Sequence, residues 1–101
     1  LTTAPSAKVK PPRIAEAPVS LECRRYTALD IGRHAVVFGE VVAIWVQDDC
    51  VLDAAKCYVD TPKLGLVGRM HGRGWYARTT DLREIPRIRL ENWRGRKKAA
   101  E

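Results

Sequence analysis

Hydrophobic residues alternate with polar ones in one segment and then form a nearly continuous run in the next. From Val19 to Tyr26, Val, Leu and Cys alternate with Ser, Glu and Arg, which is typical of a half-buried strand. After a turn over residues 29–32, most residues between Ala35 and Val46 are β-branched or aromatic and pack well on a pleated surface. We predict a strand there that is buried on both faces. Gly39 interrupts it, which favours a bulge or the close approach of a ligand.

Prolines and glycines mark the remaining elements. Four of the six prolines lie in residues 1–18, so we predict a proline-rich extended strap there. Asp60-Thr61-Pro62 is a helix-start signal and predicts a short helix over Lys63–Met70. Short strands are expected at residues 50–53 and 75–79. The sequence therefore predicts a mainly β protein with one short helix, a barrel or part of one. We divide it into the strap 1–18, a barrel part 19–88 and a basic tail 89–101.

Length and composition bound this picture. The chain has 101 residues, of which 46 % are hydrophobic, a share too high for a disordered protein and enough for one domain. No stretch approaches the ~18 apolar residues of a membrane-spanning helix, so we expect no membrane partner. The chain begins at Leu1 and its single methionine is Met70. We therefore expect that residues preceding Leu1 were removed or belong elsewhere.

The net charge of +6 is distributed unevenly. Residues 83–98 contain seven Lys/Arg and two Asp/Glu, whereas residues 40–60 contain one Lys and five acids. This arrangement differs from the broad positive face of a dedicated nucleic-acid domain, so nucleic acid is not our expected partner. The basic segment Arg94–Lys98 is interpreted as a solvated, frayed tail or, alternatively, as a polyanion-binding segment.

The three cysteines give no sign of a metal site or of a disulfide framework. Cys23, Cys50 and Cys57 are odd in number and lack CxxC spacing, which suits a reducing, cytoplasmic location. Cys23 lies in the alternating segment and is expected to be a small buried residue. The two histidines are far apart and have no ligands at suitable spacing, so we predict no metal.

Two clusters remain as candidates for binding chemistry. Gly32-Arg33-His34 precedes Gly39-Glu40-Val41 at a turn-to-strand junction; there, His34 is either a surface histidine or a donor to an anion or carbonyl. The segment 68–76 combines Arg69, glycines, Trp75 and Tyr76. It is either a packing turn or a site for an anion and a planar ring. Nucleophile motifs are absent, and we assign no catalytic residue.

These segments resemble the flavin reductase-like, FMN-binding split-barrel proteins. The stretch from Pro11 to Cys23 is similar to a segment of that family, and the His34…Gly39-Glu40-Val41 pattern and the segment 68–76 follow in the family's order. The resemblance covers roughly residues 1–88. It implies a portion of a split β-barrel, which corresponds to the C-terminal part of a family member because relatives have an additional N-terminal half.

The resemblance also implies partners and ligands. Family members are usually homodimers that bind FMN near the subunit interface, and many use NAD(P)H, often to supply a flavin-dependent monooxygenase. A Gly-Asp-His motif in short relatives is implicated in nicotinamide-nucleotide binding, which corresponds here to His34, although Arg33 replaces the acid. We expect Arg69 to contact an anion and Tyr76 to contact a ring near the flavin.

We therefore expect the C-terminal portion of an FMN-binding oxidoreductase that passes hydride from NAD(P)H to flavin. The missing N-terminal half of the same domain would then be its first partner. One alternative is a non-catalytic FMN-binding electron carrier. The other is a small basic β-barrel that binds nucleic acid through its aromatic residues and its Arg/Lys tail.

Overall fold

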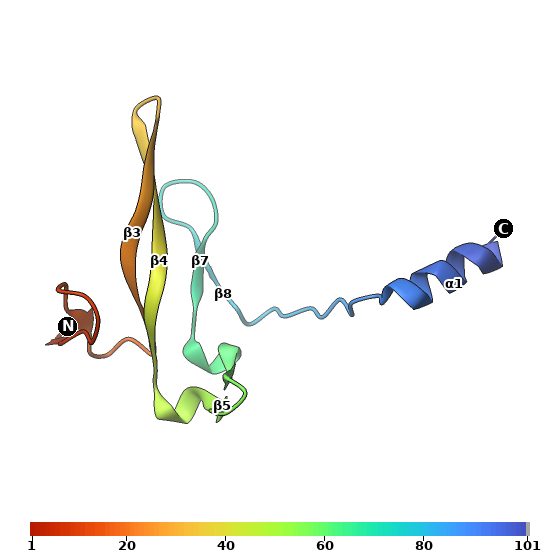
Figure 1. Ribbon diagram of the computed structural model, residues 1–101, viewed down its shortest axis with the longest axis horizontal. Coiled ribbons are helices and arrows are strands. Elements are labelled where there is room, and N and C mark those ends of the chain that lie inside the picture. Colours follow the sequence, from red (N-terminus) through yellow and green to blue (C-terminus); the bar gives the residue numbers. More distant parts are fainter. Residues whose placement is uncertain (101) are drawn as a thin grey trace. The chain divides into compact units, whose positions relative to one another are not determined.

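A long two-stranded hairpin is the main element of the first of two compact units (Figure 1). The computed structural model describes residues 1–100, and the units are Leu1–Leu66 and the segment that begins at Val67. In the first unit, β3 (Val19–Ile31) pairs antiparallel with β4 (His34–Val46). Gly32, with φ of 60°, makes the turn between them. Strand β3 therefore continues through the residues 29–31 that we assigned to a turn.

The hairpin contains two register shifts, and Gly39 lies between them. The shifts occur at Glu22/Cys23 and at Arg25/Thr27. A Cβ atom placed on Gly39 would lie 3.1 Å from Cys23 Cβ, so a side chain at this position would press against the neighbouring strand. The predicted bulge is found beside Gly39, at the Arg25/Thr27 register shift, and the group that lies close to Gly39 is the Cys23 side chain.

The strap folds into a small two-stranded loop of its own. Strands β1 (Thr3–Ala4) and β2 (Arg13–Ile14) pair antiparallel. The Ala15 amide donates to the Thr2 carbonyl at 2.9 Å, and the Thr2 amide donates to the Glu16 carboxylate at 2.8 Å. The segment is therefore more ordered than the extended strap that its prolines predict.

Short elements follow the hairpin in the first unit. A 3-10 turn η1 (Asp48–Cys50) leads into β5 (Val51–Asp53), which pairs with β6 (Tyr58–Val59). A second 3-10 turn, η2 (Thr61–Leu64), has Pro62 in its first turn and ends at Gly65, which has a left-handed conformation with φ of 64°. The predicted helix over Lys63–Met70 is thus wrong beyond its start, because Gly65 ends it after four residues.

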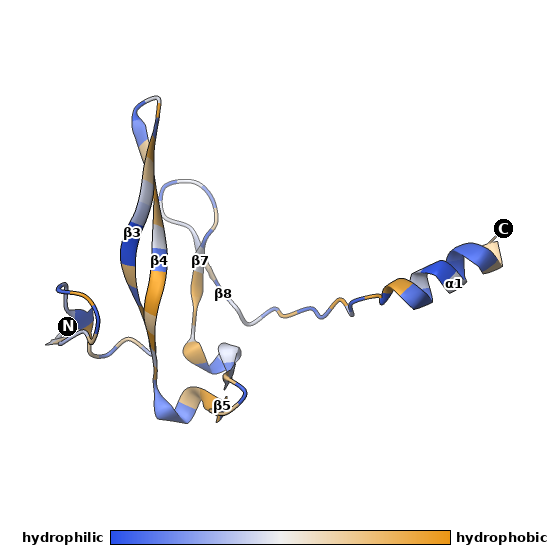
Figure 2. Ribbon diagram, viewed as in Figure 1, coloured by the Kyte–Doolittle hydropathy of each residue, from blue (hydrophilic) through white to orange (hydrophobic). Residues whose placement is uncertain are grey.

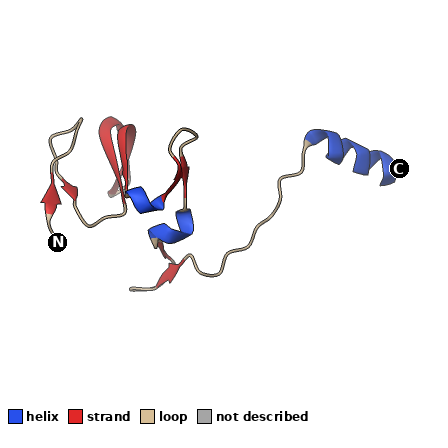
Figure 3. Ribbon diagram, turned by 90° about the horizontal axis from the view of Figure 1, so that it is seen from below, coloured by secondary structure: helices blue, strands red, loops and turns tan. Residues whose placement is uncertain are grey.

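The second unit contains a short hairpin and the one α-helix among the described residues (Figure 3). Strands β7 (Val67–Arg69) and β8 (Tyr76–Arg78) pair antiparallel around the loop 70–75. Helix α1 (Leu90–Ala100) occupies the segment that we interpreted as a frayed basic tail. The single short helix therefore lies at a different place from the predicted one.

Apolar side chains are mostly exposed in both units. Cys50 is the only buried hydrophobic residue among residues 1–100, and each sheet has two strands. Figure 2 shows a hydrophobic stretch along β4, yet Phe38 and Ile44 are both exposed. The prediction that β4 is buried on both faces does not hold within this chain, because no described element covers those side chains.

Candidate functional site

The loop between β7 and β8 closes around a single guanidinium group. Arg69 Nη1 donates to the carbonyl oxygens of His71 at 2.8 Å and Trp75 at 3.2 Å, and its Nη2 donates to the carbonyl of Gly72. The Met70 amide also donates to the Trp75 carbonyl at 2.9 Å. Three carbonyl groups of the loop therefore point inward at one charged side chain, which fixes the loop's shape.

Two aromatic contacts lie on this loop. The rings of His71 and Trp75 are stacked, with centroids 6.1 Å apart and planes 17° apart. The guanidinium carbon of Arg69 lies 5.5 Å from the centre of the Tyr76 ring, within the range of a cation–π interaction. The structure thus brings together two of the predicted site residues, Arg69 and Tyr76. Trp75, which the sequence placed in the same cluster, lies on this loop as well, and the structure adds His71 to it.

Arg69 retains donors that the loop does not use. A guanidinium has five N–H groups, and the three bonds to the loop come from Nη1 and Nη2. The Nε hydrogen and at least one further N–H are therefore left, and such donors of a guanidinium bind carboxylate or phosphate. Arg69 can therefore hold the loop and still contact an anion.

His34, the third predicted site residue, lies in the first unit. It is the first residue of β4, pairs with Ile31 across the hairpin and is exposed. The turn at Gly32 and Arg33 precedes it, so the imidazole is presented at the end of the hairpin, as the Gly-Arg-His spacing predicts. The structure leaves its relation to Arg69 and Tyr76 open, since these belong to the other unit.

A buried carboxylate that the sequence analysis did not single out anchors the strap to β3. Glu22 is only 3 % exposed and accepts hydrogen bonds from the backbone amides of Ala7 at 2.9 Å and Lys8 at 2.6 Å, and from Trp45 Nε1. The amide of Ala7, followed by those of Lys8 and Val9 and the Trp45 indole, lowers the pKa of Glu22 to about 2 against the opposing effect of burial. The carboxylate is therefore ionised and fully paired.

The same strap places Arg13 on the other side of Trp45. Its guanidinium carbon lies 4.1 Å from the centre of the indole ring, and Arg13 Nε is buried without a hydrogen-bond partner. Arg13, Trp45 and Glu22 thus form a continuous set of contacts between the strap and the base of the β3–β4 hairpin. Their role is to hold these segments together.

The phase of the β3 alternation is the reverse of the predicted one. Glu22 is buried, whereas Leu21 and Cys23 are exposed. The strap covers the face that carries Glu22, because its backbone amides need an acceptor. The hydrophobic pattern does not predict the burial of Glu22. The signal in the sequence is the single acid between Leu21 and Cys23, which follows a proline-rich segment.

The cysteines show no activation. All three are free thiols, and burial is the first cause that raises the pKa of Cys50. Within residues 1–100, no group of three or more His, Cys, Asp or Glu side chains is placed to hold a metal ion. None of the described helices is long and apolar enough to cross a membrane.

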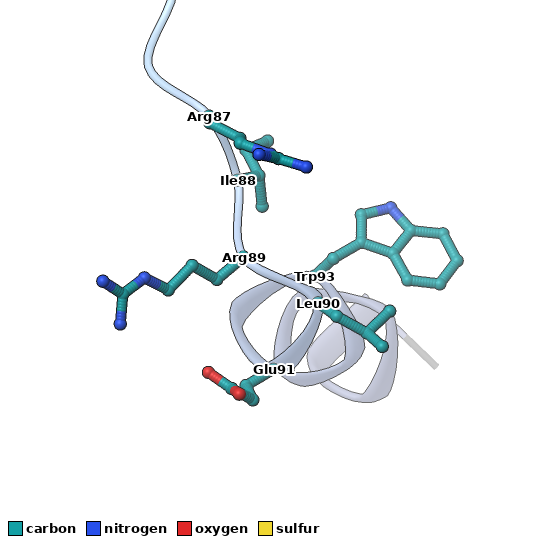
Figure 4. Close-up of a pocket in the computed structure, with 6 residues that line it drawn as sticks. All are labelled: Arg87, Ile88, Arg89, Leu90, Glu91 and Trp93. Atoms are coloured by element: carbon teal, nitrogen blue, oxygen red, sulfur yellow. The ribbon is translucent and has the colours of Figure 1, made fainter. Parts of the chain in front are cut away.

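A concave surface at the start of α1 is formed by one local segment. Figure 4 shows its lining residues, with Arg89 and Glu91 directed away from the Trp93 ring. Lys97 Nζ lies 5.6 Å from the centre of that ring, one helical turn further along. The lining comes from residues 87–93 alone, so this surface is separate from the loop 70–75 and its aromatic residues.

Comparisons with known proteins agree on one family. Residues 1–62 match the model of the flavin reductase-like domain. An uncharacterized protein of Deinococcus radiodurans is 45 % identical over 98 residues, which is 97 % of this chain and 43 % of that protein. An uncharacterized protein of Aquifex aeolicus is 40 % identical over 73 residues, which is 72 % of this chain and 36 % of that protein. The chain therefore spans less than half the length of these relatives.

A solved structure extends the likeness to the fold. The crystal structure of Pseudomonas fluorescens 2-nitrobenzoate 2-nitroreductase superposes with a TM-score of 0.77 and is 31 % identical. The superposition covers 88 % of this chain and 45 % of that one. The predicted mainly β, split-barrel fold class is confirmed, with the helix at the C-terminal end and with sheets that do not close within this chain. The chain belongs to the flavin reductase-like domain family, a family of flavin-related oxidoreductases.

Proposed function

We propose that this chain is the C-terminal portion of an FMN-binding oxidoreductase that passes hydride from NAD(P)H to flavin. The observation that carries the proposal is the family match over residues 1–62. The likeness to a 2-nitrobenzoate 2-nitroreductase supports it, since reduction of a nitroaromatic compound requires the delivery of electrons to its nitro group. When bound, a flavin supplies the redox chemistry, and the protein supplies binding and orientation.

The exposed strands support the proposal that a further segment of the domain is the first partner of this chain. An isolated two-stranded sheet is marginally stable in water, and each sheet here has two strands with exposed apolar side chains. We propose that the N-terminal half of the domain pairs with these strands and that a second copy completes a homodimer. The electron acceptor in this proposal is a flavin-dependent monooxygenase or a small molecule, and the location is the cytoplasm.

The side chains of the second unit fit part of a flavin mononucleotide. The exposed ring of Tyr76 can contact the isoalloxazine. The N–H groups of Arg69 that do not bind the loop can donate to the phosphate. Since the guanidinium is already fixed by the loop carbonyls, little conformational entropy is lost when it binds an anion. In this proposal, Arg69 and Tyr76 bind and orient the cofactor but take part in no bond breaking.

We propose that His34 contacts the nicotinamide nucleotide. It is exposed at the end of the β3–β4 hairpin, and Arg33 precedes it in the turn. An imidazole can donate a hydrogen bond to a phosphate or carbonyl, and the guanidinium of Arg33 can add a second contact to the same anion. This arrangement compensates for the acid that short relatives have at the position of Arg33.

Complementation tests the proposal. The chain is joined to the portion of the Deinococcus radiodurans relative that it does not match, and the purified protein is examined for flavin absorbance and for NADH and NADPH oxidation with added FMN. We expect retained flavin and turnover. Retained flavin without turnover would replace the reductase by an electron carrier, and a protein that retains no flavin would overturn both.

A histidine variant tests the nucleotide contact in the same protein. His34→Ala should raise the KM for NAD(P)H by roughly tenfold, the loss expected for one hydrogen bond to a charged group, and should leave flavin retention unchanged. Arg25→Ala, which changes an exposed residue of β3 in the same hairpin, is the control. An unchanged KM in His34→Ala would remove this residue from the nucleotide site.

A further inference from the structure

The loop between β7 and β8 carries two stacked aromatic side chains, His71 and Trp75. Trp75 is 65 % exposed although its ring stacks on His71. With ring centres 6.1 Å apart, the two nearly parallel rings are offset, so His71 covers only part of the indole and much of the indole stays open. An open, flat and polarisable surface is thereby presented to the solvent.

A glycine allows the backbone to support this ring. Gly72 has φ of 62°, and a Cβ atom there would lie 3.1 Å from Trp75 Cδ1. A larger residue would therefore strain the backbone and push the indole out of place. The sequence His71-Gly72-Arg73-Gly74-Trp75 supplies both rings of the stack and the small residue between them.

Arg69 fixes the loop that carries these rings. Its guanidinium binds the carbonyl groups of His71, Gly72 and Trp75, which includes the backbone of both stacked residues. An aromatic side chain on a mobile loop loses conformational freedom when a ligand binds, and that loss weakens binding. Here the loop is already ordered by charge-assisted hydrogen bonds.

We propose that His71 and Trp75 form a stacking platform for an electron-poor planar ring and that Arg69 is its positioning residue. The proposal rests on the proposed function, because the isoalloxazine of flavin, the nicotinamide of NAD(P)H and a nitroaromatic substrate all share this ring chemistry. The electron-rich indole stacks face to face on such rings. Arg69 thus acts on ring binding through the loop, in addition to any contact with phosphate.

Binding of small planar aromatic probes tests the platform directly. Equilibrium dialysis of the chain with riboflavin, 1-methylnicotinamide and 2-nitrobenzoate distinguishes the three sources of ring. We expect Trp75→Leu to weaken the bound probe at least about fivefold, as found for rings stacked on aromatic side chains, and Trp75→Phe to retain part of the affinity. Trp93→Leu, which changes an exposed tryptophan of α1, is the matched control and should have no effect.

Riboflavin and FMN together separate the two roles of Arg69. Riboflavin has no phosphate, so Arg69→Gln weakens it only if the loop positions the rings. We expect a loss of at least about fivefold together with loss of the near-ultraviolet circular dichroism of the Trp75–His71 stack. Arg78→Gln, which changes the exposed arginine at the end of β8, is the control. A loss confined to FMN would overturn the positioning role.

The outcomes distinguish the platform from the proposed function. If riboflavin binds and Trp75→Leu has unchanged affinity, the platform is overturned while flavin binding stands. If 2-nitrobenzoate or 1-methylnicotinamide binds through Trp75 but no flavin does, the platform stands and the flavin part of the proposed function fails. If the wild-type chain binds none of the ring probes, the platform is overturned.

Discussion

Two charged side chains of this chain each form several hydrogen bonds to backbone groups. One is a buried acceptor and the other is an exposed donor. Glu22 is buried and accepts from amides 14 and 15 residues away, in the middle of a proline-rich strap. Arg69 is exposed and donates to carbonyls two, three and six residues away within one loop. The buried carboxylate therefore joins distant segments, whereas the exposed guanidinium shapes a local one. Their removal should have correspondingly different effects.

Removal of the Glu22 charge should have the largest effect. One oxygen of Glu22 accepts from Lys8, and the other accepts from Ala7 and from the Trp45 indole. In Glu22→Gln, one of them becomes an NH2 group that faces an N–H donor, so one attachment is lost and the other keeps only a neutral acceptor. We expect hydrogen-exchange protection of the Ala7 and Lys8 amides to fall at least about tenfold, as measured by NMR. The β7–β8 loop amides should keep their protection.

Glu16 provides the matched control for this variant. It is an exposed glutamate on the same strap and accepts hydrogen bonds from Thr2. Glu16→Gln should change protection near Thr2 only. Equal effects of the two variants on Ala7 and Lys8 would show that burial of Glu22 does not set the strength of the anchor.

Acid should release the strap before it affects the Arg69 loop. The pKa of Glu22 is about 2 in the folded chain and roughly 4.3 in an unfolded one. Because the folded pKa is the lower, the carboxylate's contribution to stability is fully present above the unfolded pKa. It is lost as the pH falls through that value towards 2. The loop held by Arg69 uses backbone carbonyls as acceptors and no carboxylate, so acid removes no acceptor there.

NMR titration of the Ala7 and Lys8 amide shifts measures this transition. We expect a midpoint near pH 2. The titration uses a Glu16→Gln background, which removes the carboxylate of the strap itself. The pKa of Glu16 is also lowered, first by the hydrogen bond from the Thr2 side chain, so its titration would otherwise overlap. A midpoint near the ordinary glutamate pKa would contradict the anchoring geometry.

The same contrast explains how much the sequence could predict. Arg69, Trp75 and Tyr76 lie within one short segment, so the local pattern predicted that they belong together. The hairpin β3–β4 also followed from local patterns, namely the alternation, the apolar run and the turn before His34. Glu22 was missed because its partners lie far upstream and bind through their backbone amides, which every residue has. The helix α1 was missed because its strongly basic sequence has no apolar face.

Gly72→Ala should have a smaller and local effect. The left-handed backbone at Gly72 disfavours any side chain by ~1 kcal/mol, and the new methyl group also meets Trp75 Cδ1. We expect altered near-ultraviolet circular dichroism of the Trp75–His71 stack, with no change in the protection of Ala7 and Lys8.

Gly65→Ala isolates the contact from the backbone strain. Gly65 has nearly the same φ, 64°, but a Cβ there meets no atom within 4 Å. Both variants therefore carry the conformational cost, and only Gly72→Ala should disturb the aromatic spectrum. Identical spectra for the two variants would show that the close approach of Gly72 to the indole does not determine the geometry of the Trp75–His71 stack.

Removal of the Lys63 side chain, which like Glu22 binds a distant backbone group, should have the smallest effect. Lys63 Nζ donates to the Asp49 carbonyl at 2.9 Å and lies 3.7 Å from the Asp49 carboxylate, joining η2 to η1. It spans 14 residues, as one of the Glu22 contacts does, but the two side chains are 50 % and 63 % exposed. Lys63→Ala should therefore lower the free energy of unfolding by less than ~1 kcal/mol, and less again in high salt. Chemical denaturation at two salt concentrations measures this. The same denaturation series on Glu22→Gln supplies the comparison. Because the sequence separation is matched, an equal loss of unfolding free energy in the two variants would assign the difference between Glu22 and Arg69 to reach along the chain, whereas a smaller loss in Lys63→Ala assigns it to burial.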